Sequence, residues 1–348
     1  MTHDLRHIPV LPTQVIEALD PKAGRSAQVF VDCTLGLGGH SALILQRLLT
    51  SVPSKLARSV SPSRLLGIDF DPANLEFARQ KMQTLLVSSS PPPSVSAPAA
   101  AKSKKGSVRR STPPATPPVT FELFHNNFAA LPTVLAQAGV ERVEGILADL
   151  GVASPQIDDP ARGFSYRRPG PLDMRMDPTR GQPASAFINR LSEAELADAL
   201  LELGDETDAP RIAHLIVQRR ALKPITTTQE LMAVVCQARD FTLARAAGAK
   251  LHPAARTFQA LRILVNRELA NLDRLLTVLP DCLKPGGTAV IISFHSGEDR
   301  RVKSAFKDAY RAGIYAAISP DVIIADAAEQ HANPRSRSAK LRWARLPV

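Results

Sequence analysis

The sequence predicts an α/β fold in which an open parallel sheet is interrupted by an inserted helical region. Residues 29–40, VFVDCTLGLGGH, have the pattern of a buried strand, a glycine turn and the start of a helix. Further apolar strand segments alternate with helical patterns, which is typical of a parallel sheet. Between the fourth and fifth strand segments, helical patterns alone fill about a hundred residues.

The strand segments of the first half each end beside polar or aromatic residues. The expected strands are residues 29–32, 64–71, 120–126 and 144–149. Residues 7–19 are expected to form a short lead-in and a first helix with Thr13 as its N-cap, and a further helix is expected at 72–86. The side chains at the strand ends are Asp32, Asp69, Asn127, Phe128 and Asp149. Because the carboxyl ends of parallel strands meet at one edge of a sheet, we expect a ligand to bind there.

The glycine turn at residues 36–39 indicates a ligand that approaches the backbone closely, next to the positive end of a helix. A tight turn without a ligand is the alternative for such a motif taken alone. An acid at the end of the second strand, Asp69, favours the ligand, because an acid in this place usually accepts hydrogen bonds from ribose hydroxyls. The polar insertion 51–63 accounts for the long spacing between Asp32 and Asp69.

Composition limits the classes of protein. The chain has 348 residues, 44% of them apolar, and no apolar run long enough to span a membrane, so we expect a cytoplasmic protein without membrane partners. The three cysteines fit no metal-binding spacing. The net charge is +10, but residues 87–120 supply half of it, so charge alone does not establish nucleic-acid binding.

Two regions differ from the sheet segments. Residues 87–120 are rich in Ser, Pro, Ala and Lys, and we expect a disordered surface loop. Helices are expected at 194–203, 209–220, 228–239 and 257–276. A turn at 283–287 should lead into a fifth strand at 288–294, and two short strands are expected near 321–325 and 339–346.

Long strings in the sequence resemble one family. They are DCTLGLGGHS (32–41), GIDFDP (67–72), HNNF (125–128), GILADLGVASPQIDDPARGFSY (145–166), GPLDMRMDPTRGQPA (170–184), HPAARTFQALRILVNREL (252–269), LKPGGTAVIISFHSGEDRRVK (283–303) and NPRSRSAKLR (333–342). The chain resembles the bacterial small-subunit ribosomal RNA cytosine-N4 methyltransferases, the RsmH (formerly MraW) family. Gly297 is a departure, because the family usually has a leucine there.

The resemblance implies a class I (Rossmann-like) methyltransferase domain, residues 1–165 and 272–348, with a helical substrate-recognition insertion at 166–271. It implies S-adenosylmethionine as cofactor. The implied activity is methylation of the exocyclic N4 of a cytidine in the decoding region of 16S rRNA, either as naked rRNA or in the assembled small subunit. A homodimer is left open. The implied cofactor residues are Gly36, Gly38, Gly39, His40, Asp69, Phe128, Asp149 and Gln156.

The reaction needs no metal, because the sulfonium already activates the methyl group, but the cytosine amine is a weak nucleophile. An acceptor for an N4–H bond would strengthen it. Asp149 is the first candidate, followed by a nearby main-chain carbonyl and by Ser154, which could equally be a turn serine before Pro155. Phe164, Tyr166 and Phe294 are candidates for packing the target base, with burial in the core as the alternative.

Arginines near the predicted rim are expected to contact RNA phosphates, and a solvated charge is the alternative for each. They are Arg167, Arg168, Arg175, Arg300, Arg335 and Arg337. Arg175 could instead form a structural ion pair with Asp173 or Asp177. His295 could act as an acid–base group or orient a loop.

Three other functions are weighed. A DNA amino-methyltransferase, or one acting on another RNA, shares the chemistry, but the motif expected after the fourth strand of the DNA enzymes is missing. A nicotinamide dehydrogenase accounts for the glycine turn and Asp69 but not for NPRSRSAKLR or the helical insertion. A non-catalytic RNA-binding module would not need a complete set of cofactor residues.

Overall fold

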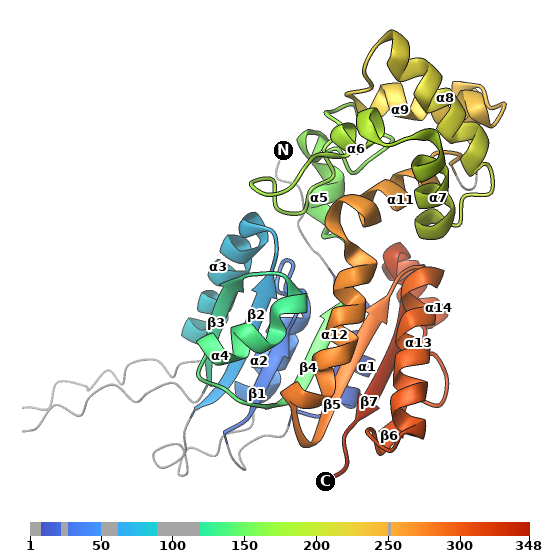
Figure 1. The fold of residues 1–348 in the computed structure, drawn as a ribbon. Coiled ribbons are helices and arrows are strands. Elements are labelled where there is room, and N and C mark those ends of the chain that lie inside the picture. Colours follow the sequence, from blue (N-terminus) through green and yellow to red (C-terminus); the bar gives the residue numbers. More distant parts are fainter. Residues whose placement is uncertain (1–7, 22–26, 50–61, 89–118, 250–251) are drawn as a thin grey trace, which may run out of the picture.

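A computed structural model of the chain describes residues 8–21, 27–49, 62–88, 119–249 and 252–348 (Figure 1). Its centre is a seven-stranded sheet in the order β3-β2-β1-β4-β5-β7-β6. The strands are β1 (Val29–Asp32), β2 (Ser63–Asp69), β3 (Val119–His125), β4 (Val143–Asp149), β5 (Leu283–Ser293), β6 (Ala317–Ile318) and β7 (Lys340–Arg345). Strands β1 to β5 are parallel, and β7 is antiparallel to both β5 and β6.

The sheet has two buried faces, and side chains alternate between them along each strand. On β5, Ala289 and Ile291 pack in one core, with α4 (Leu131–Gln137), α12 (Glu268–Cys282) and α13 (Ser296–Arg311). Val290 and Ile292 pack in the opposite core, with α1 (Pro12–Leu19), α2 (Gly39–Leu49) and Met82 of α3 (Pro72–Ser88). Short helices at the carboxyl edge are α5 (Ser154–Asp158), α14 (Ala327–Ala332), η1 (Phe128–Ala130), η2 (Pro160–Arg162) and η3 (Pro334–Ser338).

The helical region has a core of its own. Its helices are α6 (Ala184–Arg190), α7 (Glu193–Gly204), α8 (Ala209–Leu222), α9 (Thr228–Ala238), α10 (Leu243–Ala247) and α11 (Ala255–Asn266). In Figure 1 they gather at one end of the sheet, and α12 runs from them down along it. Phe164 packs into this core two residues before the expected boundary at 166. We propose the division 166–271 against 1–165 and 272–348 on the basis of these separate cores.

Several expected elements differ from the structure. Helix α1 begins with Pro12 after Leu11, so Thr13 lies inside the helix and is not its N-cap. The expected helix 257–276 is two helices, because Arg267 adopts a left-handed conformation (φ 52°) between α11 and α12. Residues 283–287, expected to form a turn, are instead the first residues of β5. The strand is irregular there: Gly286 has a positive φ of 72°, and the pairing with β4 shifts register.

Two more expectations need correction or lie outside the structure. The strand expected near 321–325 is only an isolated bridge at Ile323, and β6 lies earlier in the chain. Of the expected loop 87–120, the first residues extend α3 and the last belong to β3. The remainder, 89–118, lies outside the described residues. Among the helices that the structure does describe, none has the length and apolar character needed to cross a membrane.

Gly170 lies where two backbone segments nearly touch, and we expect Gly170→Ala to destabilise the protein by about 2–3 kcal/mol. A Cβ atom at this residue would lie 1.9 Å from the Pro160 carbonyl oxygen, so one segment would have to move. Urea unfolding measures the effect, and Gly248→Ala is the matched control, because its nearest backbone atom would be 4.0 Å from the new Cβ. Equal unfolding midpoints for the two variants would show that the close approach is not rigid.

Candidate active site

A cavity of about 310 Å³ lies over the carboxyl ends of the parallel strands. Seven of the eight residues predicted for the cofactor line it: Gly36, Gly39, His40, Asp69, Phe128, Asp149 and Gln156. The eighth, Gly38, does not line it. Its φ is 68°, and a Cβ would lie 2.9 Å from Met82, so Gly38 shapes the turn against α3.

Asp69, the last residue of β2, organises the glycine turn. One carboxylate oxygen accepts the Gly36 amide at 2.7 Å, and the other accepts the Asp71 amide at 2.8 Å and the Asn74 side chain at 3.2 Å. Burial raises the pKa of Asp69 to about 6, against the opposing effect of these hydrogen bonds. The acid predicted to hold ribose hydroxyls therefore also fixes the turn in front of it.

The affinity for S-adenosylmethionine is expected to rise as the pH increases through about 6, because ribose hydroxyls donate to the ionised carboxylate. A carboxyl with a pKa of about 6 is mostly protonated at pH 5 and ionised at pH 7.5, which predicts about tenfold weaker binding at pH 5. Folding stability should show the opposite trend, because folding raises the Asp69 pKa above its usual 3.8. The contribution of Asp69 to the free energy of unfolding is complete below pH 3.8 and is lost as the pH rises through about 6. Calorimetric titration across this range tests the binding, and an affinity independent of pH would contradict it.

His40 and Asp149 form a pair on the cavity wall. His40 Nε2 lies 2.8 Å from the Val10 carbonyl oxygen and must donate to it, while Nδ1 lies 3.5 Å from Asp149 Oδ2. Burial, together with the charges of Asp32 and Glu298, raises the pKa of Asp149 well above its usual value. Within the described residues, Asp149 Oδ1 is buried without a hydrogen-bond partner, so it is available to a ligand.

Other polar contacts hold the walls of the cavity. Gln156 accepts the Ala153 amide and donates to Asp71, so both ends of its side chain are already bonded. Asp71 also pairs with Arg162 at 2.7 Å. Arg162 in turn donates to two main-chain carbonyls, those of Arg175 and Met176. Asp71 and Arg162 lie within strings that resemble the family, but no local pattern indicates that they pair with each other.

Ser154 and the three candidate aromatic residues have different environments. Ser154 is the first residue of α5 and does not line the cavity, although its Oγ is buried and has no partner among the described residues. Phe164 packs in the helical core, and Tyr166 stacks on His252 with ring centroids 4.5 Å apart. Of the three aromatic rings, only that of Phe294 reaches the cavity.

One of the six predicted RNA-binding arginines, Arg335, lines the cavity. Arg175 forms the structural ion pair weighed from the sequence, with Asp173 at 2.7 Å. Arg168 bonds to Asp158, and Arg335 lies 3.8 Å from the same acid. Arg167 lies over the Tyr166 ring, Arg300 is 4.0 Å from Asp205, and Arg337 is exposed.

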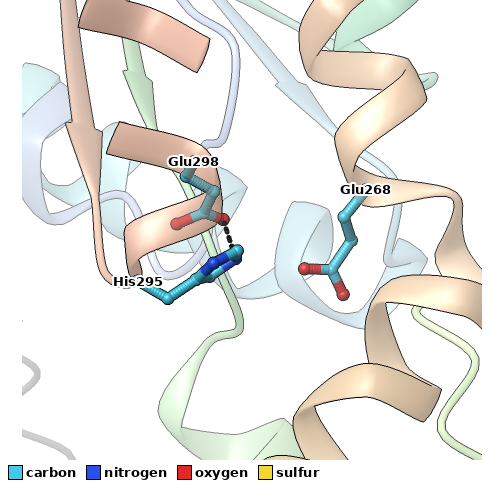
Figure 2. A group of neighbouring side chains, drawn as sticks. All are labelled: Glu268, His295 and Glu298. Atoms are coloured by element: carbon cyan, nitrogen blue, oxygen red, sulfur yellow. Dashed lines mark ion pairs between the residues drawn. The ribbon is translucent and has the colours of Figure 1, made fainter. Parts of the chain in front are cut away.

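A second polar group on the cavity wall was not predicted as a unit. Arg262, Glu268 and Glu298 line the cavity, and the His295 ring lies beside the Glu298 carboxylate (Figure 2). We call these four residues the charged cluster. Glu268 lies in the string NREL, and His295 and Glu298 lie in FHSGEDR. Nothing in the sequence shows that α11, α12 and α13 bring these residues together with Arg262.

The rim fits S-adenosylmethionine. It offers a carboxylate for a ribose, an aromatic ring at Phe128, a glycine turn at a helix start, and the unpartnered Asp149 oxygen for a charged ligand group. This donor set, over a parallel sheet with an antiparallel seventh strand, defines an S-adenosylmethionine-dependent methyltransferase of the class I fold.

The chain belongs to the MraW methylase family, whose pattern matches residues 4–89 and 115–346. It is 39% identical to a "Ribosomal RNA small subunit methyltransferase H" of Geobacter sp. (strain M21), over 97% of this chain and 98% of that protein. It is 40% identical to the protein of that name from Methylibium petroleiphilum, over 94% and 92% of the two chains. These relatives confirm the predicted family and enzyme class.

Solved structures of methyltransferases align less closely. An rRNA methylase from Streptococcus thermophilus aligns with a TM-score of 0.35 and 9% identity, over 95% of this chain and 93% of that chain. The assignment of the fold therefore rests on the strand order and the family, and not on this similarity.

Proposed function

We propose that the protein transfers a methyl group from S-adenosylmethionine to N4 of a cytidine in small-subunit rRNA. The observation that carries the proposal is Asp149, which ends β4 in the cavity and has one buried oxygen with no hydrogen bond to any residue that the structure describes. The names of the relatives point to small-subunit rRNA, and the resemblance to the cytosine-N4 enzymes points to the amine.

The chain's own residues supply position and charge. S-adenosylmethionine, when bound, supplies an electrophilic methyl group. Asp149 Oδ1 then accepts one N4–H of the base and stabilises the positive charge that develops on the nitrogen. Burial raises the pKa of Asp149, and a cationic ligand group bound beside it would favour the ionised form and oppose that effect. His40, whose Nε2 donates to the Val10 carbonyl, lies with its Nδ1 3.5 Å from the second oxygen of Asp149, and a protonated His40 would hold that oxygen.

RNA phosphates are proposed to bind along the edge that carries Arg335 and Arg337, with Arg167, Arg168 and Arg300 around it. Arg335 and Arg168 share Asp158, so a phosphate can displace that carboxylate and pair with both. Arg175 is bound to Asp173 and is the least available of the six. An rRNA substrate places the enzyme in the cytoplasm, and a homodimer stays an untested expectation.

Transfer of labelled methyl groups tests the substrate class. Small ribosomal subunits that lack the modification, large subunits and double-stranded DNA are incubated separately with the protein and labelled S-adenosylmethionine. Label in the small subunit alone supports the proposal. Label in DNA or in the large subunit would show that the protein is a methyltransferase with a different substrate from the one proposed.

A further inference from the structure

The charged cluster lies at the far end of the rim from the ribose acid. Strand order places β2, with Asp69, on one side of β1 and places β4 and β5 on the other. Asp149 ends β4, and Glu298 follows β5 on α13. A ligand that extends from Asp69 across the glycine turn therefore reaches Asp149 first, and the charged cluster lies beyond it in the same cavity.

The cluster combines hydrogen-bond donors and acceptors in a nearly buried place. Arg262 pairs side-on with Glu268, Nε to one carboxylate oxygen and one terminal nitrogen to the other, both at 2.9 Å. Its other terminal nitrogen makes no hydrogen bond to any described residue. Glu298 is only 3% exposed, accepts the Phe294 amide at 2.9 Å, and lies 3.2 Å from His295 Nε2.

Glu298 is held in its ionised form. Burial pushes the pKa of Glu298 upward, but the His295 imidazole, the Phe294 amide and the Arg262 guanidinium together hold it below the usual value. Asp149, its neighbour across the rim, has a raised pKa. Of these two carboxyls, Glu298 is therefore the one whose surroundings favour the charged form, which accepts hydrogen bonds.

We propose that the charged cluster binds the hydrogen-bonding edge of the acceptor cytosine, with Glu298 accepting the second N4–H and Arg262 donating to the ring N3 and O2. This inference rests on the proposed function and extends it to the base. The cytosine edge has one donor group, N4, and two acceptors, N3 and O2. An ionised carboxylate beside a guanidinium complements it, and uracil, with an acceptor at position 4, would face Glu298 with like polarity.

Methyl transfer to N4 forms one bond, breaks another and releases one proton. The N4 lone pair forms the new N–C bond, and the methyl C–S bond breaks with its electron pair on sulfur. The positively charged N4 then loses one proton to Glu298. His295 is the proposed positioning residue, because its Nε2 lies 3.2 Å from a Glu298 carboxylate oxygen and can donate to it once the carboxylate turns toward it.

A metal ion is the competing occupant of the cluster. Glu268, His295 and Glu298 each offer a ligand atom, and these atoms lie within 4.8 Å of one another (Figure 2). Arg262, however, already occupies both oxygens of Glu268 and supplies the positive charge that a cation would bring. A base edge uses the cluster with this pair intact, whereas a cation would have to separate it.

Two measurements on Glu298→Gln and Arg262→Lys test the proposal. Cytidine monophosphate binding to the S-adenosylhomocysteine complex, followed by saturation-transfer NMR, needs no turnover. We expect about tenfold weaker binding in either variant and, in the wild type, for an analogue without the 4-amino group. In single-turnover transfer to small subunits, Glu298→Gln should lower the rate about 100-fold. Arg262→Lys should mainly raise the subunit concentration needed for half-maximal rate.

Asp308→Asn is the matched control, because this exposed acid lies on the same helix, α13, and among the described residues its carboxylate pairs only with Arg311. It should behave like the wild type, and S-adenosylhomocysteine affinity should change less than about threefold in every variant. Nucleotide binding and transfer that stay within threefold in Glu298→Gln overturn the proposal. So does a loss of S-adenosylhomocysteine affinity, which would assign Glu298 to the cofactor or the fold.

Two further outcomes separate the alternatives. Stoichiometric Zn²⁺ or Mn²⁺ binding that Glu298→Gln abolishes, with transfer that EDTA stops, would make the cluster a metal site and overturn the proposal. Selective nucleotide binding without transfer to small subunits would support the base pocket and contradict the proposed rRNA substrate.

Discussion

Asp149→Ala is expected to lower the rate of methyl transfer by at least about 100-fold. The variant removes the buried carboxylate oxygen that has no partner in the described part of the chain, and with it the proposed acceptor of one N4–H. It also leaves His40 Nδ1 without its neighbour at 3.5 Å, so some loss of S-adenosylmethionine affinity should accompany the loss in rate. Rates at saturating cofactor separate the two effects.

Asp149→Asn refines this prediction. The amide keeps an oxygen that can accept a hydrogen bond but carries no negative charge, so we expect an intermediate rate. Asp273→Ala, at an exposed acid on α12, is the control for a lost carboxylate. An Asp149→Ala protein that transfers methyl groups within threefold of the wild-type rate would show that this residue has no part in the chemistry.

Asp69→Ala is expected to weaken S-adenosylmethionine binding by at least about 100-fold. Two hydrogen bonds from ribose hydroxyls to an ionised carboxylate contribute about 1.5–3 kcal/mol each, and about 1.4 kcal/mol corresponds to tenfold in affinity. The substitution also releases the Gly36 amide, now held at 2.7 Å, which loosens the turn. Calorimetric titration with S-adenosylmethionine measures the change.

Asn74→Ala distinguishes the loss of ribose contacts from a general disturbance of Asp69. It removes one donor to the Asp69 carboxylate, at 3.2 Å, and leaves both carboxylate oxygens in place. The affinity of the Asn74→Ala protein for S-adenosylmethionine should fall only a few-fold. A comparable fall in both variants would mean that the geometry of the β2 end, and not the carboxylate, determines binding.

The strand segments and the rim were predictable because apolar periodicity and glycine turns are local signals. Asp69 and Asp149 follow their strands directly, so the parallel sheet alone brings them to one edge. Local signals do not report conformational breaks. The apolar pattern therefore predicts one continuous helix across Arg267, whereas the left-handed conformation of this residue separates α11 from α12. Strand β6 could not be predicted, because its two residues, Ala317–Ile318, are too few to show an alternating apolar pattern.

The charged cluster could not be predicted because it depends on packing between distant segments. Arg262 and Glu268 come from two consecutive helices whose relative direction is set by the break at Arg267. Glu298 comes from α13, and its carboxylate lies within 4.8 Å of that of Glu268. Arg175 differs, because its neighbours in the sequence already suggest an ion pair with Asp173 or Asp177, and the structure shows the pair with Asp173. The partners of Arg262 and Glu298, in contrast, depend on tertiary contacts that no local pattern contains.

Identification of the methylated nucleoside tests the central claim most directly. Small subunits that lack the modification are treated with the protein and labelled S-adenosylmethionine, and the rRNA is digested to nucleosides and separated. We predict label in N4-methylcytidine, absent with Asp149→Ala and strongly reduced with Glu298→Gln. Label in C5-methylcytidine, in a ribose-methylated nucleoside or in a purine would contradict the assignment of the amine as the acceptor.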